Sequence, residues 1–81
     1  MTRQTDRHLA MIVGANIRAA RDQASLTQRE LAQRIGCEGV FISRWERGAN
    51  SPSPKYLRPL ADELFDGDIS ALYRDPNRAA A

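Results

Sequence analysis

The sequence predicts an all-α fold, a compact domain of four to five helices, on three observations. Apolar residues recur at three- and four-residue steps along most of the chain, which is the period of a helix with one buried face. No segment shows the two-residue alternation typical of a strand. Signals that start and stop helices separate the apolar stretches, and 81 residues are enough for one domain with one modest core.

The first helix is expected to run from about Thr5 or Asp6 to Gln23. Its apolar residues share one face, which we expect to be buried; they are Leu9, Val13, Ile17, Ala20 and Ala24. Gly14 lies inside this helix, and we expect it to weaken the helix slightly without ending it.

The second helix is expected over Thr27–Ile35, and a capping box marks its start. Thr27 is placed to accept a hydrogen bond from the backbone three residues on, and Glu30 to accept one from the backbone of Thr27. Gly36 follows the helix and supplies the left-handed residue that commonly ends one. The residues expected to be buried are Leu31, Ala32 and Ile35.

The third helix is expected from about Glu38 to Arg47, and Gly48 stops it. Ile42 and Trp45 are three residues apart and point to one side, so Trp45 is predicted to lie in the core. The other faces carry Val40, Ser43, Arg44 and Arg47. For Phe41 we favour burial against the fourth helix, with an exposed position as the alternative.

Two further helices complete the prediction. Ser53 and Pro54 are typical of an N-cap and a first helical residue, and they open a helix that runs to about Phe65. Pro59 lies past the first turn and removes a backbone hydrogen bond, so this helix is expected to be irregular at its start. Asp68 is placed to cap a short last helix, which carries Ile69, Leu72 and Tyr73.

These elements divide the chain into three parts. We expect residues 1–8 to form an N-terminal arm and the start of the first helix, residues 9–73 to form the domain, with a helix-turn-helix at about 27–47, and residues 74–81 to form a flexible tail. Nothing at the N-terminus resembles a signal peptide, and no apolar run is long enough to span a membrane.

The composition excludes several classes of site. One cysteine, Cys37, and one histidine, His8, make neither a disulfide framework nor a zinc site. We therefore expect Cys37 to be a small apolar filler, with a redox switch as the alternative, and His8 to be solvated. No acid–base pair, nucleophile arrangement or glycine-rich phosphate loop is present, so the sequence predicts no enzyme, no cofactor, no metal and no small-molecule ligand.

The charge is concentrated in the first half of the chain. Residues 1–48 hold eight of the twelve cationic side chains but five of the ten acidic ones, and all but one of the twelve cations are arginine. Arginine is the better donor to phosphates and to guanine edges, although a solvated basic surface would have the same composition. For Arg3, Arg7 and Arg34 we favour a solvated face, with an arm that contacts nucleic acid through Arg3 or Arg7 as the alternative.

The functional prediction depends on the second and third helices. They are joined by a tight turn at Gly36 and Cys37, and two short helices joined in this way cross steeply. The outer face of the third helix is then free to enter a major groove, which is wide enough for one helix.

The motifs LTQRELA at residues 26–32, Gly36, and ISRWERG at residues 42–48 resemble the lambda-repressor/Cro-type (XRE) helix-turn-helix family over about residues 12–73. The resemblance implies a compact four- or five-helix, lambda-repressor-like DNA-binding domain that acts as a dimer on a two-fold operator. It also implies that Arg21 and Glu46 form an ion pair between the first helix and the end of the third.

The resemblance further implies which residues contact DNA. Base contacts fall on Gly39, Val40, Ser43 and Arg44, and backbone contacts on Thr27, Gln28, Arg47, Asn50 and Lys55. Direct recognition would depend on Arg44 at a guanine and on Val40 at a thymine methyl, and one bidentate arginine contributes about 1–3 kcal/mol of discrimination. For Glu38 we favour a cap on the third helix over a contact with a cytosine amino group or repulsion of phosphate.

Two functions follow as hypotheses. The first is a sequence-specific regulator of transcription that binds double-stranded DNA in the cytoplasm, a repressor that acts as a homodimer on a palindromic operator. The second is a protein-interaction module whose partner is a toxin, a polymerase subunit or a phage factor, with DNA binding secondary. Gly39 and Val40 keep the second hypothesis open, because they give the third helix an apolar tip.

Overall fold

The computed structural model describes the backbone of residues 4–76 and the side chains of residues 7–76. The elements are α1 (Gln4–Gln23), α2 (Gln28–Ile35), α3 (Gly39–Glu46), α4 (Pro54–Leu64) and a 3₁₀ helix, η1 (Ile69–Tyr73). No strand occurs in this part of the chain. The predicted all-α fold is confirmed, although the last helix is a 3₁₀ turn and not an α-helix. The expectations for Arg3 and for residues 77–81 lie outside the described residues.

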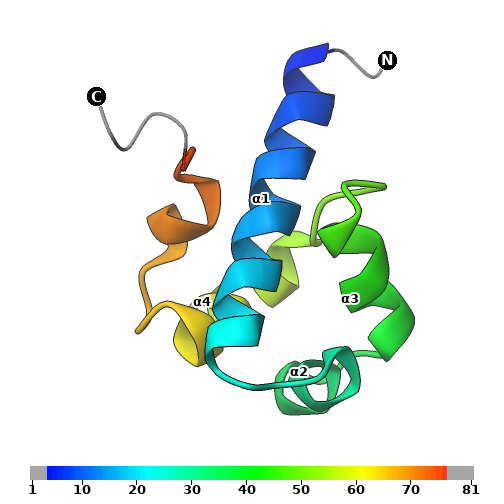
Figure 1. The fold of residues 1–81 in the computed structure, drawn as a ribbon, viewed down its shortest axis with the longest axis vertical. Helices are drawn as coiled ribbons and strands as arrows, with labels where there is room; N and C mark the ends of the chain where they lie inside the picture. Colours follow the sequence, from blue (N-terminus) through cyan, green and yellow to red (C-terminus); the bar gives the residue numbers. More distant parts are fainter. Residues whose placement is uncertain (1–3, 77–81) are drawn as a thin grey trace.

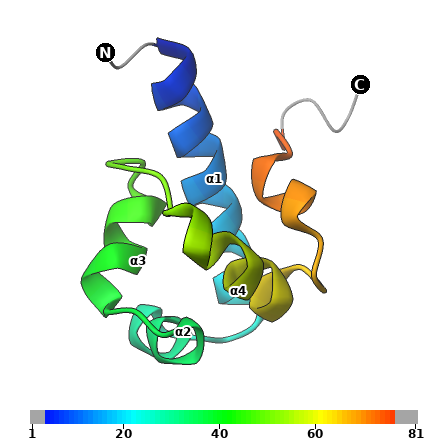
Figure 2. The ribbon, with the colours of Figure 1, turned by 180° about the vertical axis from the view of Figure 1, so that it is seen from behind.

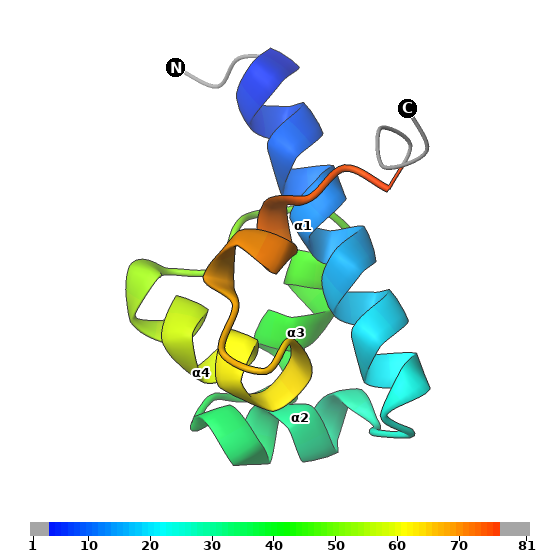
Figure 3. The ribbon, with the colours of Figure 1, turned by 90° about the vertical axis from the view of Figure 1, so that its left-hand side faces the viewer.

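Helix α1 is the axis around which the other elements are arranged (Figure 1). Helix α3 lies along one side of α1 and η1 along the other, while α2 crosses beneath the C-terminal end of α1. Viewed from behind, α4 lies in front of α1, between α3 and η1 (Figure 2). The side view shows that the N-terminal turns of α1 extend beyond the other helices (Figure 3).

All five elements contribute to one core. Its buried members are Val13, Ile17, Leu31, Ala32, Ile35, Ile42, Trp45, Leu60 and Leu72. The predicted burial of Trp45 is confirmed, and its ring lies 5.6 Å from the ring of Tyr56 on α4, centroid to centroid. Two of the apolar positions expected to be buried in the first helix are exposed. Leu9 lies on the turns of α1 that extend past the core, and Ala24 lies in the turn after α1.

Local signals define both ends of α2. The N–H of Glu30 donates to Oγ1 of Thr27 at 3.0 Å, and the N–H of Thr27 donates to Oε1 of Glu30 at 2.8 Å. The predicted capping box is therefore confirmed. At the other end Gly36 adopts φ +84°, and its N–H donates to the carbonyl of Ala32. This left-handed residue turns the chain directly into α3.

The other predicted caps have mixed outcomes. Asp68 caps η1, because its Oδ1 accepts from the N–H of Ser70 at 3.0 Å. Glu38 and Ser53 occupy the N-cap positions of α3 and α4, but neither side chain makes a cap hydrogen bond, so the predicted Glu38 cap is wrong. The expected irregularity of α4 is limited to a tight first turn, in which the N–H of Tyr56 donates to the carbonyl of Ser53. The helix then continues unbroken through Pro59.

Gly14 has a role that helix propensity does not reveal. A Cβ at this position would collide with the carbonyl oxygen of Trp45 and would lie 3.1 Å from the carbonyl carbon of Glu46. The backbone of α1 therefore packs directly against the last turn of α3. Gly48, which follows α3 with φ +73°, makes the next close approach, because a Cβ there would lie 2.9 Å from Cγ of Met11.

Asn16 fastens η1 to the opposite side of α1. Its Nδ2 donates to the carbonyl oxygens of Leu72 at 2.9 Å and of Arg74 at 2.8 Å. These are carbonyls that the end of a short helix leaves without helical partners. One side chain thus holds the C-terminal part of the described chain against α1.

Within residues 4–76, no helix combines the length and the apolar character needed to cross a membrane.

The contact at Gly14 predicts that replacing this glycine by alanine will destabilise the protein, which is the opposite of what helix propensity alone predicts. At an exposed helix position, Gly→Ala stabilises by about 1 kcal/mol. Gly14→Ala should instead lower the free energy of unfolding by about 1–3 kcal/mol, because the new methyl group meets the backbone of α3. Gly39→Ala is the matched control: its Cβ would be 3.9 Å from the nearest atom, so it should be neutral or stabilising. Urea unfolding measures both; a more stable Gly14→Ala variant would contradict this packing.

The capping box predicts a pH dependence. The hydrogen bonds from the backbone and side chain of Thr27 lower the pKa of Glu30 in the folded state. The contribution of these hydrogen bonds to the free energy of unfolding is therefore complete above the unfolded-state pKa of Glu30, about 4.3. It is lost as the pH falls through the lower pKa that Glu30 has in the folded state.

Thermal unfolding between pH 7 and pH 3 tests this. The melting temperature of Glu30→Gln should fall less over this range than that of the wild type, because a neutral amide keeps a cap without titrating. Glu38→Gln, a change at a carboxylate without a cap bond, should retain the wild-type dependence. Equal pH profiles for Glu30→Gln and the wild type would show that the cap makes no such contribution.

Candidate nucleic-acid interface

Helix α3 has one anchored face and one free face. Ile42 and Trp45 are buried, whereas Val40, Arg44 and Arg47 are exposed and Ser43 is half-buried. Alone, eight residues make too few hydrogen bonds to form a stable helix in water. The packing of Ile42 and Trp45 therefore determines which side of α3 faces outward.

The charges on the free face have no internal partners. Among the described residues, the ion-paired cations are Arg21, Arg34 and Arg74. Arg44, Arg47 and Lys55 make no ion pair there. A cation without a carboxylate partner can neutralise a phosphate without first breaking a bond to its own protein. The free face of α3, its C-cap and the first turn of α4 thus carry exposed cations that no carboxylate of the described residues pairs.

A buried carboxylate holds this surface in place. Nε and Nη2 of Arg21 donate to the two carboxylate oxygens of Glu46 at 2.6 Å and 3.0 Å. The side chain of Glu46 is only 4% exposed. The predicted ion pair is present, and its hydrogen bonds raise the pKa of Arg21 above its ordinary value. Nη1 of Arg21 also donates to the carbonyl of Leu26, so the pair fixes the turn before α2.

Gln28 lies at the start of α2 and takes part in the ion-pair network. Its Nε2 donates to Oε1 of Glu46 at 3.0 Å, so its amide belongs to the ion-pair network. A side-chain amide has a second N–H and a carbonyl oxygen, and Gln28 is only half-buried. Its first structural role is nevertheless to join the start of α2 to the end of α3.

The other predicted backbone-contact residues lie at the surface. Thr27 is exposed at the N-terminus of α2, and Asn50 is exposed in the segment between α3 and α4. Lys55 is exposed on the first turn of α4, where its ammonium lies 5.1 Å from the ring centroid of Tyr56. These candidates therefore lie at the start of α2, in the segment after α3 and at the start of α4, the two helices that flank α3 in the sequence.

Phe41 is not buried, and the prediction in favour of burial is wrong. The residue is 38% exposed, and its ring centroid lies 6.4 Å from that of Trp45. Its helical position places it at the edge of the buried stripe and not inside it. Together with Val40, which is 47% exposed, it gives the free face of α3 an apolar part.

Two other sequence expectations concern residues near the interface. Cys37 is half-buried and packs against the core. Burial, followed by the charge of the neighbouring Glu38, raises the pKa of its thiol, which favours an inert thiol over a reactive one. Arg34 is exposed as expected, with a 3.5 Å ion pair to Glu63. The described residues hold no cluster of histidine, cysteine and acidic side chains that would suit a metal.

Sequence reasoning missed three positioning residues. Gly14 and Gly48 allow α1 to approach the end of α3, and Met11 packs against Gly48. A glycine inside a long, otherwise well-formed helix is the one signal that was available in the sequence, because such a residue often marks close packing. Nothing local to Met11 indicates its partner.

Comparison with known proteins places this geometry in a family. The Helix-turn-helix family model matches residues 17–68. The chain is 32% identical over 68 residues to the HTH-type transcriptional regulator DicA of Escherichia coli (strain K12), covering 84% of this chain and 50% of DicA. It is 37% identical over 51 residues to the uncharacterized HTH-type transcriptional regulator Rv0474 of Mycobacterium tuberculosis (strain ATCC 25618 / H37Rv), covering 63% of this chain and 36% of that protein.

A solved structure shares the fold. The P22 c2 repressor protein, determined in complex with synthetic operator 9T in the presence of Tl+, matches with a TM-score of 0.72 and 30% identity. The match covers 78% of this chain and 94% of the repressor chain. This chain spans about half the length of DicA. It belongs to the helix-turn-helix family of the lambda-repressor/Cro (XRE) type, a family of regulatory domains and not of enzymes.

Proposed function

We propose that this chain regulates transcription by binding double-stranded DNA in a sequence-specific manner, with α3 in the major groove. The observation that carries the proposal is the division of α3 into an anchored face and a free face with unpaired arginines. A major groove admits one helix, and its phosphates attract the cations that border it. The likeness to a repressor solved with its operator supports the same orientation.

The base contacts are assigned by chemistry. Arg44 is exposed and unpaired, and its guanidinium suits the two acceptors on the major-groove edge of guanine. Val40 is exposed and apolar, which suits a thymine methyl. Ser43 adds a hydroxyl, and Gly39 offers its backbone where α3 begins.

The backbone contacts surround the groove. Arg47, Asn50 and Lys55 are exposed after α3, where they would meet the phosphates on one side of the groove. On the other side, the N-terminus of α2 favours an anion, and Thr27 and Gln28 lie there. These contacts would place the protein without selecting a sequence.

The regulator we propose is a repressor that acts in the cytoplasm as a homodimer on a palindromic operator. Few side chains of one α3 can select bases, so two copies on two half-sites would supply the missing specificity. Bound DNA would then be blocked for transcription.

A second candidate function is a protein-interaction module. The exposed side chains of Val40 and Phe41 favour it, because they place apolar surface on the outer face of α3. A protein partner would bury this surface, and DNA binding would then be secondary.

The two roles assigned to cations predict different mutant behaviour. Arg44→Ala should relax selection at one base position and cost about 1–3 kcal/mol at that base. Lys55→Ala should weaken binding to all sequences alike and make binding less dependent on salt. Selection from a random duplex pool, followed by fluorescence anisotropy at several salt concentrations, measures both. If duplex binding depends little on salt and Arg44→Ala leaves it unchanged, DNA recognition would be refuted and the protein-interaction module favoured.

If Val40 contacts a thymine methyl, removing that methyl should weaken binding. Replacing one thymine of the selected site by deoxyuridine removes only the 5-methyl group. Wild-type affinity should fall about fourfold at that position, from about 0.8 kcal/mol for one buried methyl. Val40→Ala should lose a similar amount on the thymine site and respond little to deoxyuridine. Full deoxyuridine sensitivity in Val40→Ala would assign the methyl contact to another residue, with Phe41 the next to test.

A further inference from the structure

Helix α1 begins well before the part of the chain that the family model accounts for. The helix starts at Gln4, whereas the match starts at residue 17. The N-terminal turns extend past the other helices (Figure 3). They carry an exposed cation, Arg7, that takes part in no ion pair among the described residues.

Contacts along one stripe of α1 show where these turns lead. Arg21 pairs with Glu46, and Gly14 lies against the backbone of Trp45 and Glu46. One turn further toward the N-terminus, Met11 lies against Gly48, and its Cα would be only 3.3 Å from a Cβ on that glycine. The stripe therefore passes the end of α3 and continues over the segment that follows it.

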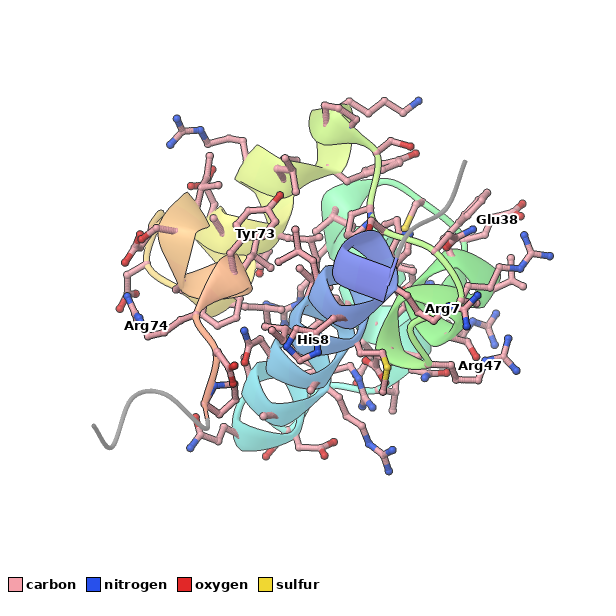
Figure 4. All side chains as sticks on the ribbon, turned by 90° about the horizontal axis from the view of Figure 1, so that it is seen from above. Arg7, His8, Glu38, Arg47, Tyr73 and Arg74 are labelled. Carbon is pink, nitrogen blue, oxygen red and sulfur yellow. The ribbon has the colours of Figure 1, made fainter. Side chains whose placement is uncertain are left out.

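Arg7 is the next position on this stripe. It precedes Met11 by four residues, so it lies on the same face about 6 Å further along the axis. The view along α1 shows Arg7 and Arg47 on the side of the molecule that holds α3, with Tyr73 and Arg74 on the opposite side (Figure 4). Glu38 also lies on the α3 side, but it is the N-cap of α3 and Arg47 is the C-cap. The two ends of the helix are separated by about 13 Å.

We propose that Arg7 contacts the DNA backbone at phosphates next to those reached by Arg47 and Asn50. The interface would thus extend beyond the helix-turn-helix onto the N-terminal turns of α1. This inference rests on the proposed function, because it continues the same positively charged surface. DNA is the occupant we favour, since an exposed, unpaired guanidinium on the same side of the molecule as Arg47 attracts a polyanion.

The contact would add affinity and salt dependence without selecting bases. Each phosphate neutralised on duplex DNA contributes about 0.9 to the slope of log affinity against log salt. Between 50 and 200 mM salt, the wild type should therefore lose about threefold to fourfold more affinity than Arg7→Gln. Arg7→Lys should remain close to the wild type, because it keeps the positive charge.

The experiment is anisotropy titration of the full chain on its selected duplex, with thermal unfolding to verify that each variant is folded. Arg74→Gln is the matched control: it removes one exposed arginine from the opposite side of the molecule. Arg47→Gln is the positive control for a phosphate contact. Each protein is also titrated on duplexes shortened stepwise at each end. The phosphate that Arg7 contacts should be lost on shortening before the phosphate that Arg47 contacts.

The inference is supported if Arg7→Gln lowers the slope of log affinity against log salt and Arg74→Gln does not. The effect of Arg7→Gln should also disappear on a shortened duplex on which Arg47→Gln still has its effect. It is overturned if Arg7→Gln matches the wild type while Arg47→Gln lowers the slope. It is also overturned if Arg74→Gln has an equal effect, or if the Arg7→Gln effect persists on every duplex, because both results indicate net charge and not a contact. Wild-type binding without salt dependence would instead refute the proposed function itself.

Discussion

The rest of the structure depends on the contact between α1 and the C-terminal end of α3. Gly14 lets the two backbones meet, and the carboxylate of Glu46 lies beside that meeting point. Burying an unpaired carboxylate costs several kcal/mol. Here Arg21 and Gln28 donate hydrogen bonds to it from two other helices. One buried group thus joins α1, α2 and α3. Truncating Arg21 would leave the buried carboxylate of Glu46 with only the neutral amide of Gln28, and truncating Glu46 would leave Arg21 with Asp22 and the carbonyl of Leu26.

This arrangement separates the residues that hold α3 from the residues that α3 presents. Glu46, Ile42 and Trp45 face inward and fix the orientation of a helix too short to be stable alone. Val40, Arg44 and Arg47 face outward and have no strong internal partner. The internal ion pair stabilises the domain, while the outward charges remain available for a ligand. Two kinds of arginine therefore have opposite roles in one small domain.

Helix α1 connects the two sides of the molecule. On one side it contacts α3 and carries Arg7, and on the other Asn16 holds the carbonyls at the end of η1. The longest helix of the described chain thus contains a glycine. The middle and C-terminal turns of α1 make contacts along two faces, and the local cost of Gly14 is offset by the packing that the glycine permits.

The sequence by itself determined the elements and their ends. Periodicity placed the helices, the Thr27–Glu30 box and Gly36 bounded α2, and the spacing of Ile42 and Trp45 predicted the buried side of α3. These features depend on neighbours within about one helical turn. The tertiary structure alone decided what depends on distant partners: the exposure of Leu9 and Phe41, the hydrogen bond from Gln28 to Glu46, the need for Gly14, and the position of Arg7 on the side of the molecule that holds α3. Those outcomes follow from which backbone segments meet across the core, and no local pattern records which segments those are.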